Sequence, residues 1–475
     1  MTAIEAPPLI IQGGMGAAVS NWVLARTTAL RGQLGVVSGT GIDTVLVRRL
    51  QDGDVGGHMR RAMERFPIPE VSLGVLRDYF RDGGRPKGEP YKPLPLHTAK
   101  VGRMRQLLTM LANFVEVHLA KDGHDGAVGI NLLTKIQLPT LASLYGAMLA
   151  GVDYVLMGAG IPREIPGALD RMARHEPASI KLDVEGLAAG ATQQLTLDPK
   201  EYWPAEPPAA LKRPHFLAII ASNLLATMLA RKANGRVDGF VIEGPTAGGH
   251  NAPPRGEVVF NERAEPVYGA RDVVDLDKIR ELGLPFWLAG SAGSPAGLRG
   301  AVAAGAAGIQ VGTLFAFCDE SGLNEAYKRE VLASARRGKV DVITDARASP
   351  TGYPFKVVTW EGSVRADEQR ERVCDMGYLR TMYAREDGRV AFRCPSEPID
   401  TYLKKGGAIE DTVGRQCLCN ALMANVGHGQ VRDGGHVEPP ILTAGDDLKV
   451  IGTFLGERER YCAADVIAYL KGETT

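Results

Sequence analysis

Short apolar runs that lead into glycine or a small polar residue recur along the first two thirds of the chain. Eight candidate strands of this kind can be counted, starting near Pro8, Leu34, Ala127, Tyr154, Phe216, Asp238, Pro285 and Gly308. The runs are continuous rather than alternating, as expected for parallel strands that are buried on both faces. Segments with helical spacing separate most of them, and strand, glycine turn and helix in alternation is typical of βα units. The pattern predicts an α/β fold, a (β/α)8 TIM barrel.

Two stretches interrupt this rhythm, and it stops altogether after Glu320. Residues 67–102 are rich in proline, glycine and charge, and residues 178–214 contain two strand-like runs that suggest a hairpin. Bare loops of this length are uncommon in compact domains, so both are interpreted as inserts. We therefore expect a barrel over residues 1–320, with inserts at about 67–102 and 178–214. Residues 321–475 are expected to form an appended, mostly helical region that packs on the barrel mouth.

An open doubly wound sheet is the alternative fold for such a pattern. It would be favoured by Gly-x-Gly-x-x-Gly after a strand with an acidic residue about 20 positions later, and the chain lacks that combination.

The helix after the first strand is expected to have Ser20 as its N-cap.

The stretch from 237 to 317 concentrates the residues that could carry chemistry. One strand leads into Gly244-Pro-Thr-Ala-Gly-Gly-His250, the next into Gly290-Ser-Ala-Gly293, and the last into Gly312-Thr313. In a βα barrel the loops after the last two strands commonly hold a phosphate. Glycine lets backbone N–H groups approach such an anion closely. The sequence therefore predicts a phosphate cradle beside one histidine on a loop.

Composition narrows the class of protein. Lys+Arg and Asp+Glu both number 55, so the net charge gives no indication of a nucleic-acid or anionic membrane partner. No apolar run approaches the roughly 20 residues of a membrane span. The N-terminal residues lack the basic start of a signal peptide, and six cysteines in 475 residues are too few for a disulfide framework. These features predict a cytoplasmic enzyme.

Four motifs in this order resemble one known family. They are Ile10-Ile-Gln-Gly-Gly-Met-Gly16, Gly244-Pro-Thr-Ala-Gly-Gly-His250, Leu288-Ala-Gly-Ser-Ala-Gly293 and Gln310-Val-Gly-Thr-Leu-Phe315. Together they are similar to the nitronate monooxygenase (2-nitropropane dioxygenase) family of FMN-binding TIM barrels, which is related to flavin enoyl-ACP reductases. The resemblance covers residues 8 to 320. The inserts and the long C-terminal region exceed a compact member of that family, and Ala-Gly-Ser-Ala-Gly replaces its more usual Ala-Gly-Gly-Ile.

The resemblance implies FMN as the cofactor and assigns roles to individual residues. His250 matches the histidine that acts as a base or as a substrate-orienting group. The implied cofactor-binding residues are Gln12, Gly13, Gly14, Met15, Asn131, Gly248, Gly249, Gly290, Ser291, Ala292, Gly293, Gln310, Gly312 and Thr313. No metal site is implied.

Two enzymatic functions are compatible with these motifs. The favoured one is a nitronate monooxygenase that oxidises alkyl nitronates or nitroalkanes with O2, because proton removal beside a nitro group needs a base such as His250. The alternative is an NAD(P)H-dependent enoyl-thioester reductase, whose partner would be an acyl carrier protein. A third hypothesis is a flavin-binding subunit without turnover, and a homodimer is compatible with any of the three.

Two further features admit more than one interpretation. Cys417-Leu-Cys419 with His428 and His436 is a candidate zinc set, but its spacing is not Cys-x-x-Cys, so packed thiols are favoured. Residues 348–355 read either as a rigid lid at the barrel mouth or as a plain turn.

Overall fold

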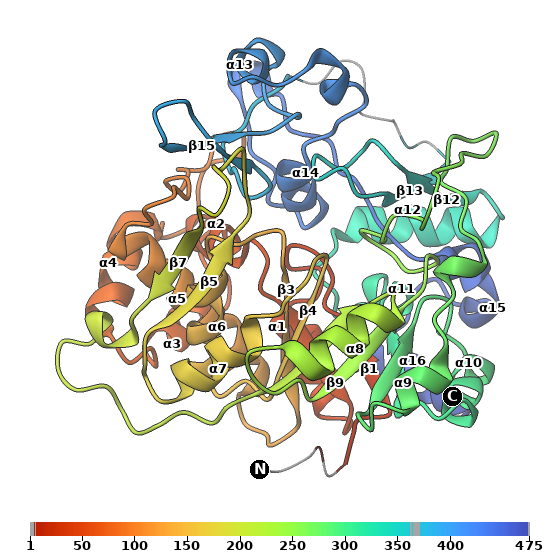
Figure 1. Cartoon of the computed structure of the whole chain (residues 1–475). Helices are drawn as coiled ribbons and strands as arrows, with labels where there is room; N and C mark the ends of the chain where they lie inside the picture. The colour runs from red at the N-terminus through yellow and green to blue at the C-terminus, as the bar shows by residue number, and fades with distance from the viewer. Residues whose placement is uncertain (1–3, 5, 362, 364–370, 474–475) are drawn as a thin grey trace.

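The computed structural model describes residues 4, 6–361, 363 and 371–473. At its centre is a closed barrel of parallel strands in the order β1-β11-β10-β9-β8-β4-β3-β2 (Figure 1). The strands are β1 (Ile10–Gln12), β2 (Leu34–Ser38), β3 (Val128–Leu133), β4 (Tyr154–Gly158), β8 (His215–Ile220), β9 (Gly239–Glu243), β10 (Phe286–Ala289) and β11 (Gly308–Val311). Each corresponds to one of the predicted strands, so the predicted TIM barrel is confirmed.

Helices surround this barrel and connect its strands. They are α1 (Trp22–Ala29), α2 (Ile42–Gln51), α3 (His58–Met63), α4 (Pro69–Tyr79), α5 (Arg103–Lys121), α6 (Thr140–Leu149), α7 (Ile165–Ala173), α8 (Asn223–Lys232), α9 (Leu276–Arg280), α10 (Pro295–Ala303) and α11 (Thr313–Ala316). Ser294 caps α10 by accepting the N–H of Gly297 at 2.9 Å. The predicted cap at Ser20 is wrong, because Asn21 caps α1 and the Ser20 hydroxyl instead holds the loop after β1. No helix among the described residues is long and apolar enough to cross a membrane.

The barrel interior changes character along its axis. Its middle is apolar and closely packed, and includes Ile11, Val36, Leu217, Val241 and Trp287. Side chains alternate between the two faces of a strand, so the residue two positions after an inward-facing one also faces inward. By this alternation Glu243 follows Val241 into the interior at the carboxyl end of β9. The polar layer of the barrel thus lies at the mouth, where the strands end.

The insert before β8 forms the predicted hairpin. β5 (Ala178–Leu182) pairs antiparallel with β7 (Gln193–Leu197). Between them, β6 (Val184–Glu185) pairs in parallel with β14 (Thr381–Ala384), which pairs in turn with β15 (Val390–Arg393). The insert and the segment after the last barrel strand therefore share a small sheet.

The segment after α11 contains two antiparallel strand pairs that the sequence pattern does not predict. In one pair β12 (Val340–Asp345) lies beside β13 (Phe355–Trp360), and the other is β14–β15. The helices of this segment are α12 (Glu325–Arg336), α13 (Ile399–Lys404), α14 (Leu418–Asn425), α15 (Ile451–Leu455) and α16 (Ala463–Lys471). Short 3-10 helices in the whole chain are η1 (Pro199–Tyr202), η2 (Ala270–Asp272), η3 (Ile409–Thr412), η4 (Asp433–Gly435) and η5 (Asp446–Val450).

The last helix returns to the barrel wall. α16 packs against α1 and α10, and in Figure 1 it lies beside α10 near the C-terminus, far from α13. The Tyr461 hydroxyl, just before α16, donates to the carbonyl of Leu314 in α11 at 2.8 Å. By position α16 is the eighth helix of the barrel, between the seventh and the first. The segment 317–462, called the mouth segment below, is therefore an excursion within the eighth βα unit.

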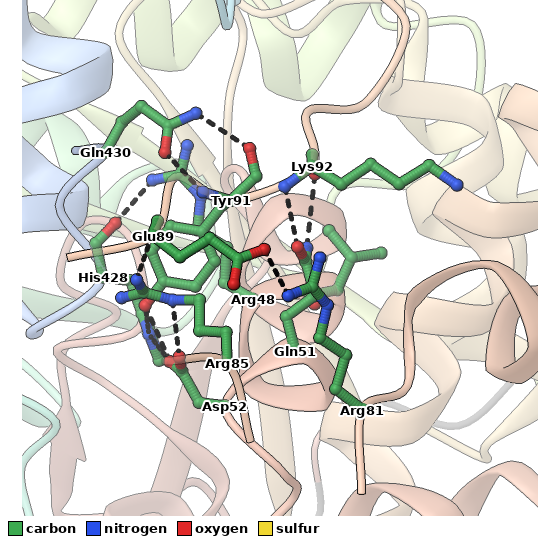
Figure 2. A network of polar contacts seen from close by, with 11 residues as sticks. Arg48, Gln51, Asp52, Arg81, Arg85, Glu89, Tyr91, Lys92, His428 and Gln430 are labelled. Atoms are coloured by element: carbon green, nitrogen blue, oxygen red, sulfur yellow. Dashed lines mark hydrogen bonds and ion pairs between the residues drawn. The ribbon is translucent and has the colours of Figure 1, made fainter. Parts of the chain in front are cut away.

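A polar network anchors the first insert to the mouth segment (Figure 2). Asp52 at the end of α2 accepts the Tyr91 hydroxyl at 2.7 Å and the Arg85 Nε–H at 3.0 Å, and its carboxylate lies 3.1 Å from Nδ1 of His428. Gln430 pairs with both backbone groups of Tyr91, at 2.8 and 3.0 Å. These contacts join segments that are more than 300 positions apart in the sequence.

Candidate active site

A cavity of about 230 Å³ lies at the barrel mouth, where the strands end at their carboxyl termini. The barrel provides its floor through residues such as Asn131, Glu243 and Gln310. The mouth segment provides the opposite wall, which is largely apolar: Phe355, Met376, Leu379, Leu418, Leu422 and Met423, with the ring of Tyr378. The site is thus built by two parts of the chain.

The structure brings nearly all of the predicted site residues together here. The cavity is lined by Gly13, Gly14, Met15, Asn131, Gly248, Gly249, His250, Gly290, Ser291, Ala292, Gln310, Gly312 and Thr313. Gln12 and Gly293 are not in its lining. Gln12 is fully buried, donates to Ser20 Oγ at 2.9 Å and accepts the N–H of Val36 at 3.0 Å, so it supports the loop after β1 from behind.

His250 lies on the loop after β9 and contacts the mouth segment. Its Nε2 is 2.7 Å from Ser349 Oγ, and its ring meets that of Phe355 edge to face, with the centroids 4.8 Å apart. Burial, with a smaller contribution from the positive charge of Lys135, lowers the pKa of His250 to about 4. The imidazole is therefore neutral near pH 7, and residues 348–355 hold it in place rather than forming a plain turn.

Two glycine positions need the absence of a side chain. A β-carbon on Gly14 would lie 2.2 Å from Cβ of Asn131, so the loop after β1 rests directly on β3. Gly290 has φ of +91°, and a β-carbon there would lie 2.9 Å from Thr246 Oγ1. Ser291, which follows, also has a left-handed φ of 54°. The loop after β10 is thus held in a conformation that turns its backbone toward the cavity.

The floor of the cavity contains polar atoms without partners. Asn131 Oδ1 and Gln310 Oε1 are buried and accept no hydrogen bond from the described residues. Unsatisfied buried oxygens in a native structure call for an explanation, and a ligand with N–H donors supplies one. The flavin ring system presents such a donor, so these residues fit the cofactor that the motifs imply.

The predicted phosphate loops meet a carboxyl group. Thr313 Oγ1 donates to Asp447 Oδ1 at 3.4 Å and accepts the N–H of Gly445 at 2.9 Å. A β-carbon on Gly293 would lie 2.9 Å from Asp447 Oδ2. Burial, helped by the neighbouring charge of Asp446, raises the pKa of Asp447. A phosphate in these loops would be next to Asp447, whose charged form would repel the anion and whose raised pKa favours the neutral form.

Several residues of the cavity were not predicted from the sequence. Glu243 is the clearest case, because burial raises the pKa of its carboxyl group to about 7. A charged residue that ends an otherwise apolar strand was the available signal. Tyr378 and Asp447 come from the mouth segment, and no periodic pattern marks them.

Four of the six cysteines are grouped in the mouth segment. Cys374, Cys394, Cys417 and Cys419 line one small cavity in the mouth segment. Burial raises the pKa of Cys374 to about 12 and that of Cys394 to about 11, so these thiols are protonated at neutral pH. Within the described residues, no three His, Cys, Asp or Glu side chains are arranged to hold a metal ion. His428, part of the candidate zinc set, contacts Asp52 instead.

Fold and cavity together define a βα barrel with a polar floor at its mouth and a histidine on the loop after the sixth barrel strand. Residues 204–351 match the family model described as nitronate monooxygenase, and this stretch contains His250 and both predicted phosphate loops. The match confirms the resemblance that the motifs indicate.

Individual relatives support the same resemblance over part of the chain. The nitronate monooxygenase of Pseudomonas aeruginosa is 36% identical over 121 residues, which are 25% of this chain and 32% of that protein. The chain thus matches about a third of the length of the curated relatives.

Two solved structures extend over nearly the whole chain. Nitroalkane oxidase from Streptomyces ansochromogenes shows 16% identity and a TM-score of 0.47, covering 98% of this chain and 96% of that one. FabK from Thermotoga maritima shows 16% identity and a TM-score of 0.46, covering 99% and 95%. Scores of this size carry no weight on their own, and the architecture rests on the strand pairing described above.

Proposed function

We propose that the chain is an FMN-dependent oxidoreductase of the nitronate monooxygenase type, which oxidises alkyl nitronates or nitroalkanes with O2. The observation that carries this proposal is His250: it lies in the cavity, on the loop of the matched stretch, and is fixed by Ser349 at 2.7 Å. A flavin, when bound, supplies the electron transfer between substrate and oxygen.

The residues of the chain would hold that cofactor in a defined orientation. Asn131 and Gln310 would meet polar atoms of the flavin ring, since their buried oxygens are free to accept. The loops at Gly290 and Gly312 would approach the phosphate through backbone N–H groups. Neutral His250 would orient the nitro group by a hydrogen bond, and the apolar wall of the mouth segment would keep water out.

One observation favours the enoyl-thioester reductase as a second candidate. The wall formed by Phe355, Leu418, Leu422 and Met423 is an apolar surface suited to an acyl chain. In that case NAD(P)H would be the reductant and an acyl carrier protein the partner.

Anaerobic spectroscopy separates the two candidates. The purified protein would be mixed in turn with propionate 3-nitronate, NADH and NADPH while its visible spectrum is recorded. Loss of flavin absorbance with the nitronate alone is the expected result. Reduction by a nicotinamide with no response to the nitronate would favour the reductase, and a colourless protein that does not take up FMN would contradict both.

A further inference from the structure

Glu243 is a carboxyl group that faces the cavity floor. It ends β9, pairs in register with Ala289 of β10, and comes seven residues before His250. Both residues line the same cavity, together with the unsatisfied oxygens of Asn131 and Gln310. The position is at the carboxyl end of a barrel strand, where the reactive groups of such barrels lie.

Two other buried acids of this chain have cationic partners. Asp43 pairs with Arg105 at 2.6 Å, and Glu116 pairs with Arg49 at 2.7 Å. The carboxyl group of Glu243 has no hydrogen bond or ion pair within the described part of the chain. A partly buried acid that faces a cavity without a cationic partner is costly to keep charged, so ion pairing does not explain this residue. The position of the Glu243 carboxyl group suits a residue that gains and loses a proton during a reaction.

His250 is poorly placed to accept a proton near neutral pH. Its Nε2 is engaged with Ser349 Oγ, and that hydroxyl also contacts Thr351 Oγ1 at 2.8 Å. The surroundings also disfavour the imidazolium ion, since burial and Lys135 bring the pKa of His250 to about 4. An orienting role suits this histidine better than that of the base.

We propose that Glu243 is the catalytic base that removes the proton from the carbon next to the nitro group of a neutral nitroalkane. This inference rests on the proposed function. The Glu243 carboxylate gains the proton, the C–H bond breaks, and its electron pair becomes the C=N bond of the nitronate. The negative charge moves from the carboxylate to the nitro oxygens, so no further reactant is needed.

The pKa of Glu243 suits a base that removes a proton near neutral pH. Burial alone raises its pKa to about 7, with no charged neighbour contributing. The other titratable groups that line the cavity are His250, Tyr378, Cys419 and Asp447. A base is most effective when its pKa lies near the working pH.

Deuterium exchange at the carbon beside the nitro group tests the step without turnover. The FMN-loaded protein would be incubated anaerobically with 2-nitropropane in D2O and followed by NMR, as wild type, Glu243→Gln and the exposed control Glu281→Gln. We expect Glu243→Gln to lose exchange by on the order of 10²-fold or more, because general-base catalysis contributes that much. Bleaching by preformed nitronate should stay unchanged in Glu281→Gln, and in Glu243→Gln it should fall far less than the exchange, because a preformed nitronate needs no base.

The wild-type pH profile gives a second test that needs no variant. Exchange should rise with pH through a midpoint near 7, the value for Glu243, and a midpoint near 4 would assign the base to His250. Equal exchange by Glu243→Gln and wild type would overturn the inference and leave the proposed function intact. A wild-type protein that neither exchanges nor bleaches with nitronate would overturn both.

Discussion

The barrel and the mouth segment build the same cavity by different means. The barrel contributes residues whose positions follow from strand register: Gly13, Asn131, Glu243 and Gln310 all lie in or just after paired strands. The mouth segment contributes its wall from loops and short elements, held by polar side chains. The floor is therefore suited to fixed cofactor chemistry, and the wall is the part that can set substrate preference without disturbing that floor.

The contacts between the two parts can be tested most strongly at Asp43 on α2. Asp43 accepts from Arg105 at 2.6 Å and from the hydroxyl of Tyr378, whose ring lines the cavity. Asp43→Asn would leave Arg105 buried without its charge partner. We expect the free energy of unfolding to fall by about 3–5 kcal/mol, as for other broken buried pairs. Urea denaturation measures this.

A control and a pH series sharpen that result. Asp387 is exposed and pairs with Arg385 and Arg389 of its own turn, so Asp387→Asn should leave the stability close to that of wild type. Burial would raise the pKa of Asp43, but Arg105, His97 and Tyr378 together bring it well below its usual range. The folded-state pKa lies below the unfolded value of about 4, so this stabilisation is complete above pH 4 and lost as pH falls further. A variant as stable as wild type would show that the two parts are held elsewhere.

His250→Ala tests whether the contact across the cavity serves catalysis. The change removes the hydrogen bond with Ser349 and the edge-to-face contact with Phe355. We expect turnover of nitronate and nitroalkane alike to fall by about 10–100-fold, because the nitro group of the substrate would lose its hydrogen bond to His250. A hydrogen bond to a charged group contributes about that much. FMN binding should persist, because the predicted phosphate loops at Gly290 and Gly312 follow other strands. His58→Ala, in α3 outside the cavity, is the control, and a loss confined to neutral nitroalkanes would make His250 the base.

The same contrast explains what the sequence could and could not predict. The strands, their order in the chain and most of the loops that line the cavity follow from apolar runs with glycine exits, because register in a barrel is fixed by local pattern. The motif assigns Gln12 to the flavin, but its side chain supports the loop after β1 and is not in the cavity lining, because a motif does not show on which face of a strand a side chain lies. Ser349 and Tyr378 approach from irregular segments and Asp447 from the short helix η5, and long-range contacts of that kind leave no periodic trace. The packing of α16 against the barrel helices α1 and α10 could not be predicted for the same reason.

Asp447 makes the mouth segment part of the predicted phosphate site. As pH rises through its raised pKa, its carboxylate would repel the phosphate, so FMN affinity should weaken. Asp447→Asn removes that charge and should bind FMN on the order of tenfold more tightly at high pH, about one pKa unit of interaction. Flavin fluorescence titrations over a pH series that begins in the ordinary range of a carboxyl group measure it. The exposed Asp277→Asn should behave as wild type, and weaker binding by Asp447→Asn would mean that Asp447 helps to hold the cofactor.

The smallest expected effect concerns the network that joins the first insert to the mouth segment. The Tyr91 hydroxyl donates to Asp52 at 2.7 Å, while its ring packs under the guanidinium group of Arg85 at 3.8 Å. Tyr91→Phe keeps the ring contact and removes one hydrogen bond, so we expect a loss of about 1 kcal/mol in the free energy of unfolding. Tyr79→Phe is the matched control, since Tyr79 makes a ring contact with Lys92 and its hydroxyl has no hydrogen bond within the described residues. Because Arg85 and His428 still contact Asp52, the cavity should keep its shape and the affinity for FMN should not change. If Tyr91→Phe lowers FMN affinity as well, this anchor positions the cavity wall and the two parts of the chain are coupled beyond their direct contacts.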